Sequence, residues 1–418
     1  MIKGGVKNLK KIVLISSGQP SLNPRLVKEA DALADNDYAV TVLYSYWNEW
    51  GTAFDKILLP TKKWRAVCIG GDPEQKPVVY FLSRLIHKVA RAINQKTGGK
   101  ALINLAISRP SCFLIQAAKK YKADFYIGHN LGALPATVKT AKANKKQCGF
   151  DAEDFHRNEV SDDKRDPDVV LKTNIENRYF SRLDYLSASS PLIASAYHKL
   201  FPDKEPEILL NVFPSSAKIS HPVLNNSKPV RLFWFSQTIG PRRGLEEAIA
   251  SLAILKEYSF ELHLLGHITA DNRATFANDF ITANQVSVHF HDPVAPDEII
   301  PFASQFDIGL AIETGVPLNR DICLTNKIFN YLQSGLCVIA SDTAAQLQLI
   351  DQYPTVGKIY KKADPHSLAD VLLYYYRNRE KLFEARKAAL AIAQEQLNWE
   401  NESKKFLKLV EQTLNHGN

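Results

Sequence analysis

The stretch VRLFWFSQTIGPRRGLEEAI, residues 230–249, decides the fold class of this chain. It opens with a near-continuous apolar run, passes through a loop in which two glycines bracket two arginines, and ends in a helical pattern. Apolar runs without alternation are typical of parallel strands that are covered on both faces. A strand, a glycine-containing loop and a helix in this order predict the first part of a βαβ unit.

The same succession recurs in two series along the 418 residues. The apolar runs lie at 11–16, 40–45, 124–129, 148–152, 185–189 and 207–211 in the first series, and at 230–236, 261–266, 286–290, 307–312, 336–341 and 356–360 in the second. Helical patterns separate most of these runs, so each series predicts a doubly wound parallel sheet. A chain of this length suits two such domains better than one.

We therefore predict an α/β protein of two Rossmann-like domains that face a central cleft. The N-terminal domain is expected at residues 1–212 and the C-terminal domain at 230–395. The polar, aperiodic segment 213–229 between them has the composition of a linker. Residues 396–418 are expected to form a final helix, with Asn398 as its N-cap.

Positive charge is concentrated in the first half of the chain. The net charge is +8, and residues 1–215 hold 32 Lys and Arg against 22 Asp and Glu. Within 56–149 the count is 18 against 3. A field of this sign attracts a membrane surface, a polyanion or an acidic substrate.

A membrane surface is favoured among these partners. The helical segment 83–96 carries an apolar stripe of Leu85, Ile86, Val89 and Ile93 beside its basic positions. Nucleic acid is disfavoured, because the basic region lacks interleaved aromatic residues and any known binding motif. The partner expected from this charge pattern is therefore an anionic membrane.

The composition also indicates the cellular compartment of the protein. The five cysteines are scattered, without a CxxC pair or metal-type spacing, which is typical of a reducing cytosol. No apolar run reaches 18 residues, so no membrane-spanning helix is expected. The N-terminus is interpreted as a first strand and not as a signal peptide. The protein is thus expected in the cytoplasm, at the inner face of the membrane if it is membrane-associated.

Ligand-binding residues are expected in the loops that follow the strands, because open α/β sheets bind ligands there. In the second series a diphosphate is expected on backbone donors, a helix N-terminus and guanidinium groups. A further strand-end histidine and carboxylate, and the start of a short helix, add phosphate and sugar contacts. The predicted donor-binding residues of this half are Gly240, Arg242, Arg243, Gly244, His267, Glu313, Asn326, Lys327 and Asn330.

In the first series, Gly18 follows the first strand and is the expected anion contact. The GxGxxG and Walker A patterns are absent, so dinucleotide binding is not supported. Acidic residues and histidines gather after two other strands, where they could orient acceptor hydroxyls or stabilise a cationic transition state. Asp151 and His129 are the acceptor-side candidates, and Glu153, Asp154 and His156 the catalytic ones. No metal is expected, because DAED has no fixed metal spacing.

The motifs FSQTIGPRRGLEEAI (235–249), TNKIFNYLQSGLCVIASD (325–342) and GFDAEDFHR (149–157) resemble those of retaining GT-B glycosyltransferases of the large family that includes sucrose synthase-like and mannosyltransferase-like enzymes. The resemblance covers nearly the whole chain. It implies that the first motif holds a donor diphosphate, that the second binds the nucleotide ribose, and that the third lies near the acceptor. It also implies that the C-terminal helix returns to the N-terminal domain.

Three positions depart from the family pattern. The family's loop arginine falls on Thr238, so Arg242 is a candidate for its role, while Arg243-Gly244 match the usual Lys-Gly. The ribose-binding glutamate falls on Asn330, and the domain-one histidine falls on Glu153.

Together these observations predict transfer of a sugar from a nucleotide-diphosphate sugar to a hydroxyl acceptor. The resemblance implies retention of configuration, no cofactor beyond this co-substrate, and a role in surface polysaccharide or glycolipid synthesis. Two alternatives remain: a nucleotide-sugar epimerase of the same fold, and a non-catalytic GT-B partner protein, which the departures from the pattern keep open.

Overall fold

The computed structural model describes residues 9–215, 219, 221–224, 226, 229–241, 243–276, 281 and 286–416. Arg242 lies outside the described residues, as does part of the predicted linker. The chain divides into two compact units, which are described one at a time. The first unit takes in the chain up to Leu209 together with Pro317–Asn319 and Ser403–Asn418, and the second Leu210–Val316 and Arg320–Glu402.

The first unit is built on a seven-stranded sheet in the order β3-β2-β1-β4-β5-β6-β7, with every neighbouring pair parallel. Its strands are β1 (Lys11–Ser16), β2 (Ala39–Tyr44), β3 (Arg65–Cys68), β4 (Phe125–His129), β5 (Gln147–Ala152), β6 (Tyr185–Ala188) and β7 (Glu207–Ile208). The sequence patterns missed β3. That strand lies at the sheet edge and has no fully buried residue, so it lacks the apolar run of a central strand.

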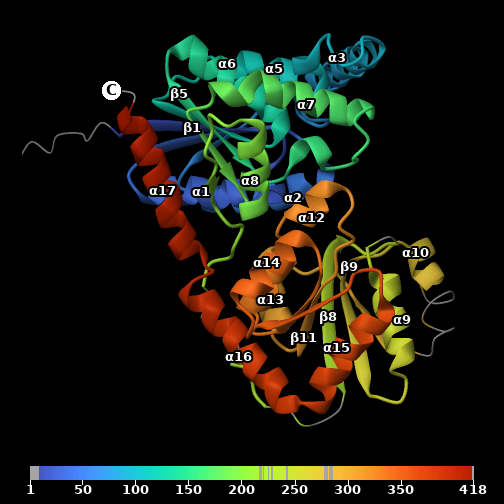
Figure 1. Ribbon diagram of the computed structural model, residues 1–418. Coiled ribbons are helices and arrows are strands. Elements are labelled where there is room, and N and C mark those ends of the chain that lie inside the picture. Colours follow the sequence, from blue (N-terminus) through green and yellow to red (C-terminus); the bar gives the residue numbers. More distant parts are fainter. Residues whose placement is uncertain are drawn as a thin grey trace, which may run out of the picture. The chain divides into compact units, whose positions relative to one another are not determined.

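Helices cover both faces of this sheet. They are α1 (Pro24–Asp35), α2 (Glu49–Leu58), α3 (Pro77–Lys96), α4 (Ile103–Ala106), α5 (Ser111–Ala118), α6 (Leu134–Asn144), α7 (Pro167–Tyr179) and α8 (Pro191–Leu200). Figure 1 shows α5, α6 and α7 over one face and α1 over the other. The central strands β1 and β4 are buried almost throughout, as their apolar runs predicted.

The second unit has a six-stranded parallel sheet in the order β10-β9-β8-β11-β12-β13. Its strands are β8 (Val230–Thr238), β9 (Phe260–His267), β10 (Val288–His291), β11 (Ile308–Ala311), β12 (Cys337–Ser341) and β13 (Gly357–Tyr360). Apolar side chains of β8, β9 and β11, among them Trp234, Leu262 and Ile308, form its core with the helices that cover them.

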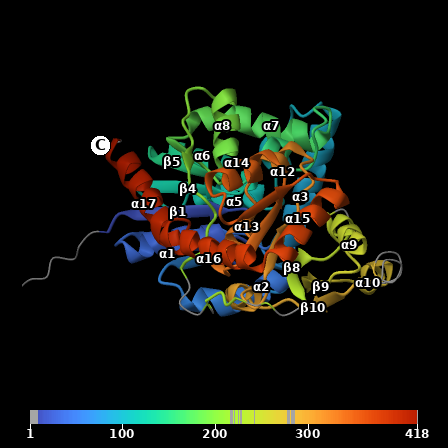
Figure 2. The ribbon, with the colours of Figure 1, turned by 60° about the horizontal axis from the view of Figure 1, so that its bottom comes forward.

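The helices of this unit again lie on two sides of the sheet, with α9 and α15 on one side and α13, α14 and α16 on the other (Figures 1 and 2). They are α9 (Leu245–Ile254), α10 (Ala270–Thr275), α11 (Ile299–Ala303), α13 (Asn326–Gln333), α14 (Ala344–Gln352), α15 (Pro365–Arg377) and α16 (Arg379–Glu395). The first two residues of α12 (Leu318–Ile322) group with the first unit and the rest with the second. The prediction of two doubly wound α/β domains is thus confirmed.

Strand order fixes where each sheet can hold a ligand. In both sheets the chain starts in the middle, adds strands toward one edge, and then returns to add strands toward the other. The order reverses between β1 and β4 in the first unit and between β8 and β11 in the second. Loops diverge at such a switch point and leave a crevice beyond the carboxyl ends of the strands.

Helix α17 (Trp399–His416) begins in the second unit and, from Ser403 onward, groups with the first. The side chain of Asn398 accepts a hydrogen bond from the N–H of Asn401 at 2.9 Å, which confirms the predicted N-cap. Phe406 and Val410 are fully buried. The helix is therefore held by packing along its length as well as by its cap.

We predict that Asn398→Ala lowers the free energy of unfolding by about 1 kcal/mol, because it leaves a first-turn N–H of α17 without its acceptor. Asn398→Asp keeps an acceptor at the same position and should lose less. The measurement is the shift in the urea unfolding midpoint. Equal losses in the two variants would contradict a capping role.

Candidate functional site

The loop between β8 and α9 is fixed against the end of β11. Gly244 has a φ of +80°, and a Cβ atom there would lie 2.1 Å from Cγ2 of Ile312. Any other residue would therefore face both backbone strain and a clash. Since β8 and β11 flank the switch point, this contact places the start of α9 beside the crevice of the second unit.

Glu313 and Lys327 meet at the same place. The Lys327 Nζ lies 2.9 Å from Oε1 of Glu313, and both side chains are largely buried, with 16% and 14% of their surface exposed. The backbone of Glu313 is held in turn, because its N–H donates to Oγ of Ser341 at 2.9 Å and its carbonyl accepts from that hydroxyl at 2.9 Å. The pair is thus a positioned charge pair at the carboxyl end of β11.

The N-terminus of α13 lies in the same group of residues. Thr325 takes the N-cap position, but its side chain makes no capping hydrogen bond. The N–H of Ile328 donates to the carbonyl of Thr325 at 3.2 Å, so the N–H groups of Asn326 and Lys327 are the ones in this turn that keep their capacity for another acceptor. The side chain of Lys327 adds a full positive charge there. Asn326 is exposed at this helix start. This is the arrangement that suits a phosphate or another anion.

The start of α9 is less suited to an anion than the sequence suggested. Arg243 is partly buried and donates from Nη1 to Oγ of Ser236 at 2.9 Å, so it lies at the carboxyl end of β8 as expected. However, Glu246 and Glu247 stand in the first turn of α9. Two carboxylates there oppose an anion, so the favourable helix end of this crevice is that of α13 and not that of α9.

Three other residues predicted to bind the donor, Gly240, His267 and Asn330, have surroundings that differ from those of Lys327 and Arg243. Gly240 is buried and does not have a positive φ, so its backbone needs no glycine. His267 ends β9 with an exposed side chain, and its carbonyl accepts from the N–H of Ile239 at 2.8 Å. Asn330 is only 1% exposed, and within the described part of the chain its Oδ1 has no hydrogen-bond partner. Its predicted ribose contact stays a prediction.

In the first unit, the ends of β1 and β4 are joined across the switch point. The Ser16 hydroxyl donates to Oδ1 of Asn130 at 2.9 Å and accepts from the N–H of Gly18 at 3.1 Å. Asn130 has a φ of 63°, which is unusual for a residue with a side chain. A Cβ on Gly18 would lie 3.7 Å from Asn130 Oδ1, an ordinary contact, so this loop does not require the glycine.

The helix that follows is also already capped. Asn23 accepts a hydrogen bond from the N–H of Leu26 at 3.0 Å, so part of the positive end of α1 is occupied by the chain itself. One first-turn donor is thus satisfied within the chain, and the expected anion contact of Gly18 stays a prediction.

A buried ionic cluster lies beneath this switch point, formed by Arg25 and Glu29 of α1, His129 of β4 and Asp151 of β5. Arg25 donates to both carboxylate oxygens of Asp151, with Nη2 at 2.7 Å from Oδ1. His129 Nε2 lies 3.1 Å from Oε2 of Glu29. None of the four side chains is more than 1% exposed. Buried charges require partners of this kind, and here each has at least one.

His129 and Asp151 are therefore corrected as acceptor-side residues. With no exposed surface, neither can touch an acceptor directly. Glu153 is where the cluster reaches the surface: its carboxylate is 22% exposed, lies 3.7 Å from Nδ1 of His129, and accepts from Nδ2 of Asn23 at 2.6 Å. The cluster can position Glu153, and Glu153 can meet a substrate.

The other two catalytic candidates are engaged by contacts within the chain. Asp154 accepts from Nδ2 of Asn319 at 2.8 Å, and burial raises the pKa of its carboxyl group. His156 is 5% exposed, with Nδ1 3.6 Å from a carboxylate oxygen of Glu159. Burial opposes its charge, but the hydrogen bond and charge of Glu159 prevail and raise its pKa. Of the three, Glu153 is a partly exposed carboxylate that also contacts the buried cluster.

Sequence reasoning missed Arg25, Glu29 and Asn130. Arg25 and Glu29 are four residues apart on α1, which puts them on one helical face among apolar residues. A charged pair on the buried face of a helix is a signal that could have been used. Their partners on β4 and β5 are 100 or more residues away and had no local signal.

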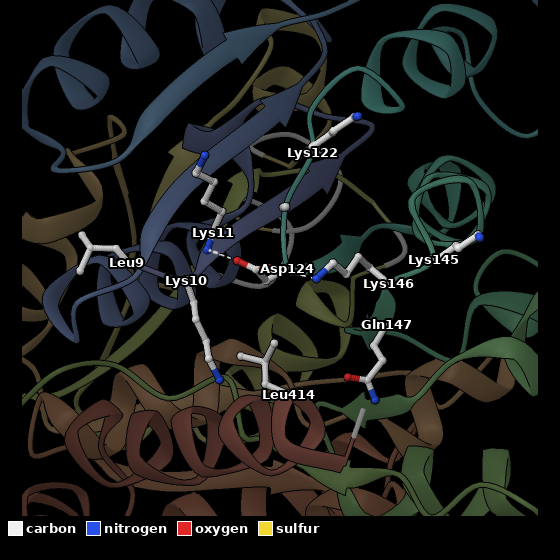
Figure 3. Close-up of a pocket in the computed structure, with 10 residues that line it drawn as sticks. Leu9, Lys10, Lys11, Lys122, Asp124, Lys145, Lys146, Gln147 and Leu414 are labelled. Atoms are coloured by element: carbon white, nitrogen blue, oxygen red, sulfur yellow. Dashed lines mark hydrogen bonds and ion pairs between the residues drawn. The ribbon is translucent and has the colours of Figure 1, made fainter. Parts of the chain in front are cut away.

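A cavity of about 770 Å³ lies at the opposite, amino edge of the same sheet. Figure 3 shows its lysines around the starts of β1, β4 and β5. Asp124 offsets part of the charge, since it lies 3.1 Å from Nζ of Lys146 and accepts from the N–H of Lys11. The lining residues are Leu9, Lys10, Lys11, Lys122, Ala123, Asp124, Lys145, Lys146, Gln147 and Leu414. None of the predicted site residues is among them.

Solved structures resemble this chain along its whole length. HepE from Anabaena, in complex with UDP and glucose, has a TM-score of 0.68 at 15% identity, covering 96% of this chain and 100% of that chain. A glycosyltransferase from Rickettsia africae has a TM-score of 0.68 at 11% identity, with 97% and 99% covered. Sucrose-phosphate synthase from Thermosynechococcus elongatus has 0.66 at 14%, with 96% and 98% covered.

The fold is GT-B. At sequence identities of 11–15%, the structural similarity establishes the fold alone. No family model matches the chain, and no curated protein matches it. Because GT-B chains consist of two doubly wound domains, the two switch points described above are the places in this fold where residues from separate strands converge.

We predict that His129→Gln flattens the pH dependence of stability between about pH 6.5 and 10. Burial opposes the charge on His129, but Glu29, Glu153 and Asp151 prevail and raise its pKa to about 10. At pH values between the pKa of His129 in the unfolded chain and its pKa in the native state, the native state holds one more proton than the unfolded chain. The stabilisation that this proton provides is complete below the unfolded-state pKa. As the pH rises toward the native-state pKa, that stabilisation declines by up to about 1.4 kcal/mol per pH unit.

The pH dependence of stability must be compared between the variant and the wild type, because the titration of Lys28 changes the stability in the opposite direction as pH rises. Burial and Arg25 lower the pKa of Lys28 to about 7, so its contribution rises with pH over part of the same range. The measurement is the free energy of urea unfolding at several pH values. Parallel curves for the two proteins would contradict a charged His129.

Proposed function

We propose that this chain is a glycosyltransferase that moves a sugar from a nucleotide-diphosphate sugar to a hydroxyl acceptor. The observation that carries the proposal is the convergence of Lys327, Glu313 and the uncapped start of α13 at the switch point of the second unit. The likeness of the fold to HepE, which was solved with UDP-glucose as well as with UDP and glucose, supports this assignment.

The proposed chemistry rests on charge at the leaving group. As the sugar bond breaks, negative charge builds up on the departing diphosphate. Lys327, Arg243 and the N–H groups at the start of α13 would stabilise that charge. In the free protein Glu313 neutralises Lys327 at 2.9 Å. A bound diphosphate would compete for the ammonium group and leave the Glu313 carboxylate to accept sugar hydroxyl hydrogen bonds.

We assign the acceptor side to Glu153. It is a partly exposed carboxylate at the end of β5, and its position is fixed by hydrogen bonding to Asn23 and by the buried ionic cluster. A carboxylate so placed could orient an acceptor hydroxyl or assist its deprotonation. Asp154 and His156 would then act by shaping the loop that carries Glu153. Retention of configuration and independence from a cofactor are part of the proposal through the family resemblance.

We expect nucleotide diphosphates and their sugars to raise the melting temperature of the wild type in a thermal-shift screen of UDP, GDP, ADP and their sugars. Lys327→Ala should lose most of this shift, because it removes the charge at the start of α13, and Arg243→Ala should abolish sugar transfer. Lys381→Ala, an exposed lysine elsewhere in the second unit, is the matched control. Full ligand response and activity in both site variants would remove the donor assignment.

Incubation without an acceptor separates the alternative functions. A transferase leaves the donor largely intact until a hydroxyl acceptor is added, whereas an epimerase converts the donor alone. A non-catalytic partner protein would bind the nucleotide without consuming its sugar. Product analysis by NMR also reports the anomeric configuration and so tests retention.

We further propose that the first unit rests on an anionic membrane at its cytoplasmic face. Helix α3 turns its large apolar residues outward and its small ones inward: Ser83 and Ala90 are buried, while Phe81 is 64% exposed and Leu85 59% exposed. The exposed members are Val78, Phe81, Leu82, Leu85, Val89 and Ile93. Their spacing of three and four residues places them on one face of the helix.

Charge complementarity identifies an anionic bilayer as the partner of this face. Helix α3 contains two arginines and two lysines and no acidic residue. A helix with an apolar face and basic flanks binds at the interface of anionic lipids. Among the described residues, no helix is both long and apolar enough to cross a membrane. A lipid-linked acceptor, as in polysaccharide or glycolipid synthesis, would be reached from such a surface.

We expect the wild type to float with vesicles that contain anionic phospholipid at low salt, and to be released by high salt. Leu85→Ser/Val89→Ser should lose flotation, because it removes two exposed apolar side chains from the outer face of α3. Ile254→Ser, at an exposed apolar position of the second unit, should float like the wild type. Absence of wild-type flotation at low salt would count against the membrane contact and leave the donor assignment unaffected.

A further inference from the structure

Four side chains that can bind a metal lie together at the β10 edge of the second sheet. Glu261 and His263 belong to β9, and His289 and His291 belong to β10. In the parallel register His289 lies opposite His263. Since alternate residues of a strand point to the same face, all four side chains project from one face of the sheet. The two strands lie side by side in Figure 2.

The distances within this group are short. His263 Nε2 is 3.3 Å from Oε2 of Glu261, and His263 Nδ1 is 3.0 Å from Nε2 of His291. One ligand atom from each of Glu261, His263 and His289 lies within 4.8 Å of the others. Tetrahedral zinc with bonds of about 2.0–2.1 Å needs ligand atoms roughly 3.3 Å apart. His289 is exposed, so its ring can turn to close the remaining gap.

We propose that Glu261, His263 and His289 bind one divalent transition-metal ion of the zinc class, with His291 as a positioning residue. Two imidazoles and a carboxylate are a ligand set that zinc accepts. The hydrogen bond between His263 Nδ1 and His291 Nε2 fixes the ring when Nδ1 carries the proton, and this leaves Nε2 of His263 free for the metal.

The surroundings of the group fit a structural site. Phe306 packs on His263 with ring centroids 4.7 Å apart, and Phe302 lies 5.1 Å from His291. These rings close the inner side, while the partly exposed Glu261 leaves an entry from solvent. A bound ion would join the edge strand β10 to β9. The expectation that no metal is bound rested on the spacing of DAED and did not consider these histidines, which lie in two apolar runs that are separate in sequence and have no motif spacing.

The test uses the untagged full-length chain, treated with a chelator and desalted. Titration of Zn²⁺ against a chromophoric chelator should show one equivalent bound per chain. Co²⁺ in its place should give the visible absorption bands of a low-coordinate site. His289→Ala and Glu261→Gln should each weaken binding at least about tenfold, and His291→Ala should weaken it about tenfold with one equivalent retained.

His366→Ala, at an exposed histidine of the same unit, is the matched control and should bind like the wild type. Circular dichroism checks that the variants fold, which the exposure of His289 and Glu261 favours. The proposal is overturned if the wild type binds no stoichiometric Zn²⁺. It is also overturned if His289→Ala and Glu261→Gln bind as tightly as His366→Ala. The response of His289→Ala to nucleotides tests the donor site separately.

Discussion

The central strands of both sheets are buried on both faces, and this constraint decides where the polar chemistry of the chain can be. Inside such a sheet a polar side chain would lack water and a partner, so the central strands carry almost only apolar residues. Polar side chains are admitted where a strand ends. All strands of a sheet are parallel, so their ends meet at one edge and bring together residues far apart in sequence. Lys327 and Glu313, and Ser16 and Asn130, meet in this way.

The two switch points differ in how their charges are held. In the second unit the Lys327–Glu313 pair keeps some exposure, so an anion can compete for the ammonium group. In the first unit the charges of Arg25, Glu29, His129 and Asp151 are sealed from water and satisfy one another. Removing one partner would leave a buried charge uncompensated, which is strongly destabilising. The first arrangement suits a ligand that comes and goes, and the second suits a fixed support for Glu153.

Surface features extend the same reasoning outside the crevices. Helix α3 exposes apolar side chains that a helix normally buries, because its inner face carries small and polar residues such as Ser83 and Asn94. The edge of the second sheet gathers histidines because β10 has a neighbour on one side only, which leaves space beside it. In both places a surface of the protein is left without a partner from the chain itself. The proposed partners are an anionic membrane for α3 and a metal ion for the histidine group.

The sequence by itself determined the fold class, eleven of the strands to within two residues at either end, the N-cap at Asn398, and the loops of the second unit that hold Gly244, Glu313 and Lys327. These follow from local signals: apolar runs, glycines and polar residues at strand ends. Strand β7 was placed but is shorter than its apolar run, and β3 was missed because an exposed edge strand has no such run.

Only the tertiary structure decided which of those polar residues face solvent. It buried His129, Asp151 and His156, bonded Asp154 to Asn319, and left Glu153 partly exposed beside the buried cluster. It also paired Arg25 with Asp151 and set His263 beside His289. The reason is physical: burial and charge pairing depend on what packs against a residue, and those partners come from strands and helices that local sequence patterns do not connect.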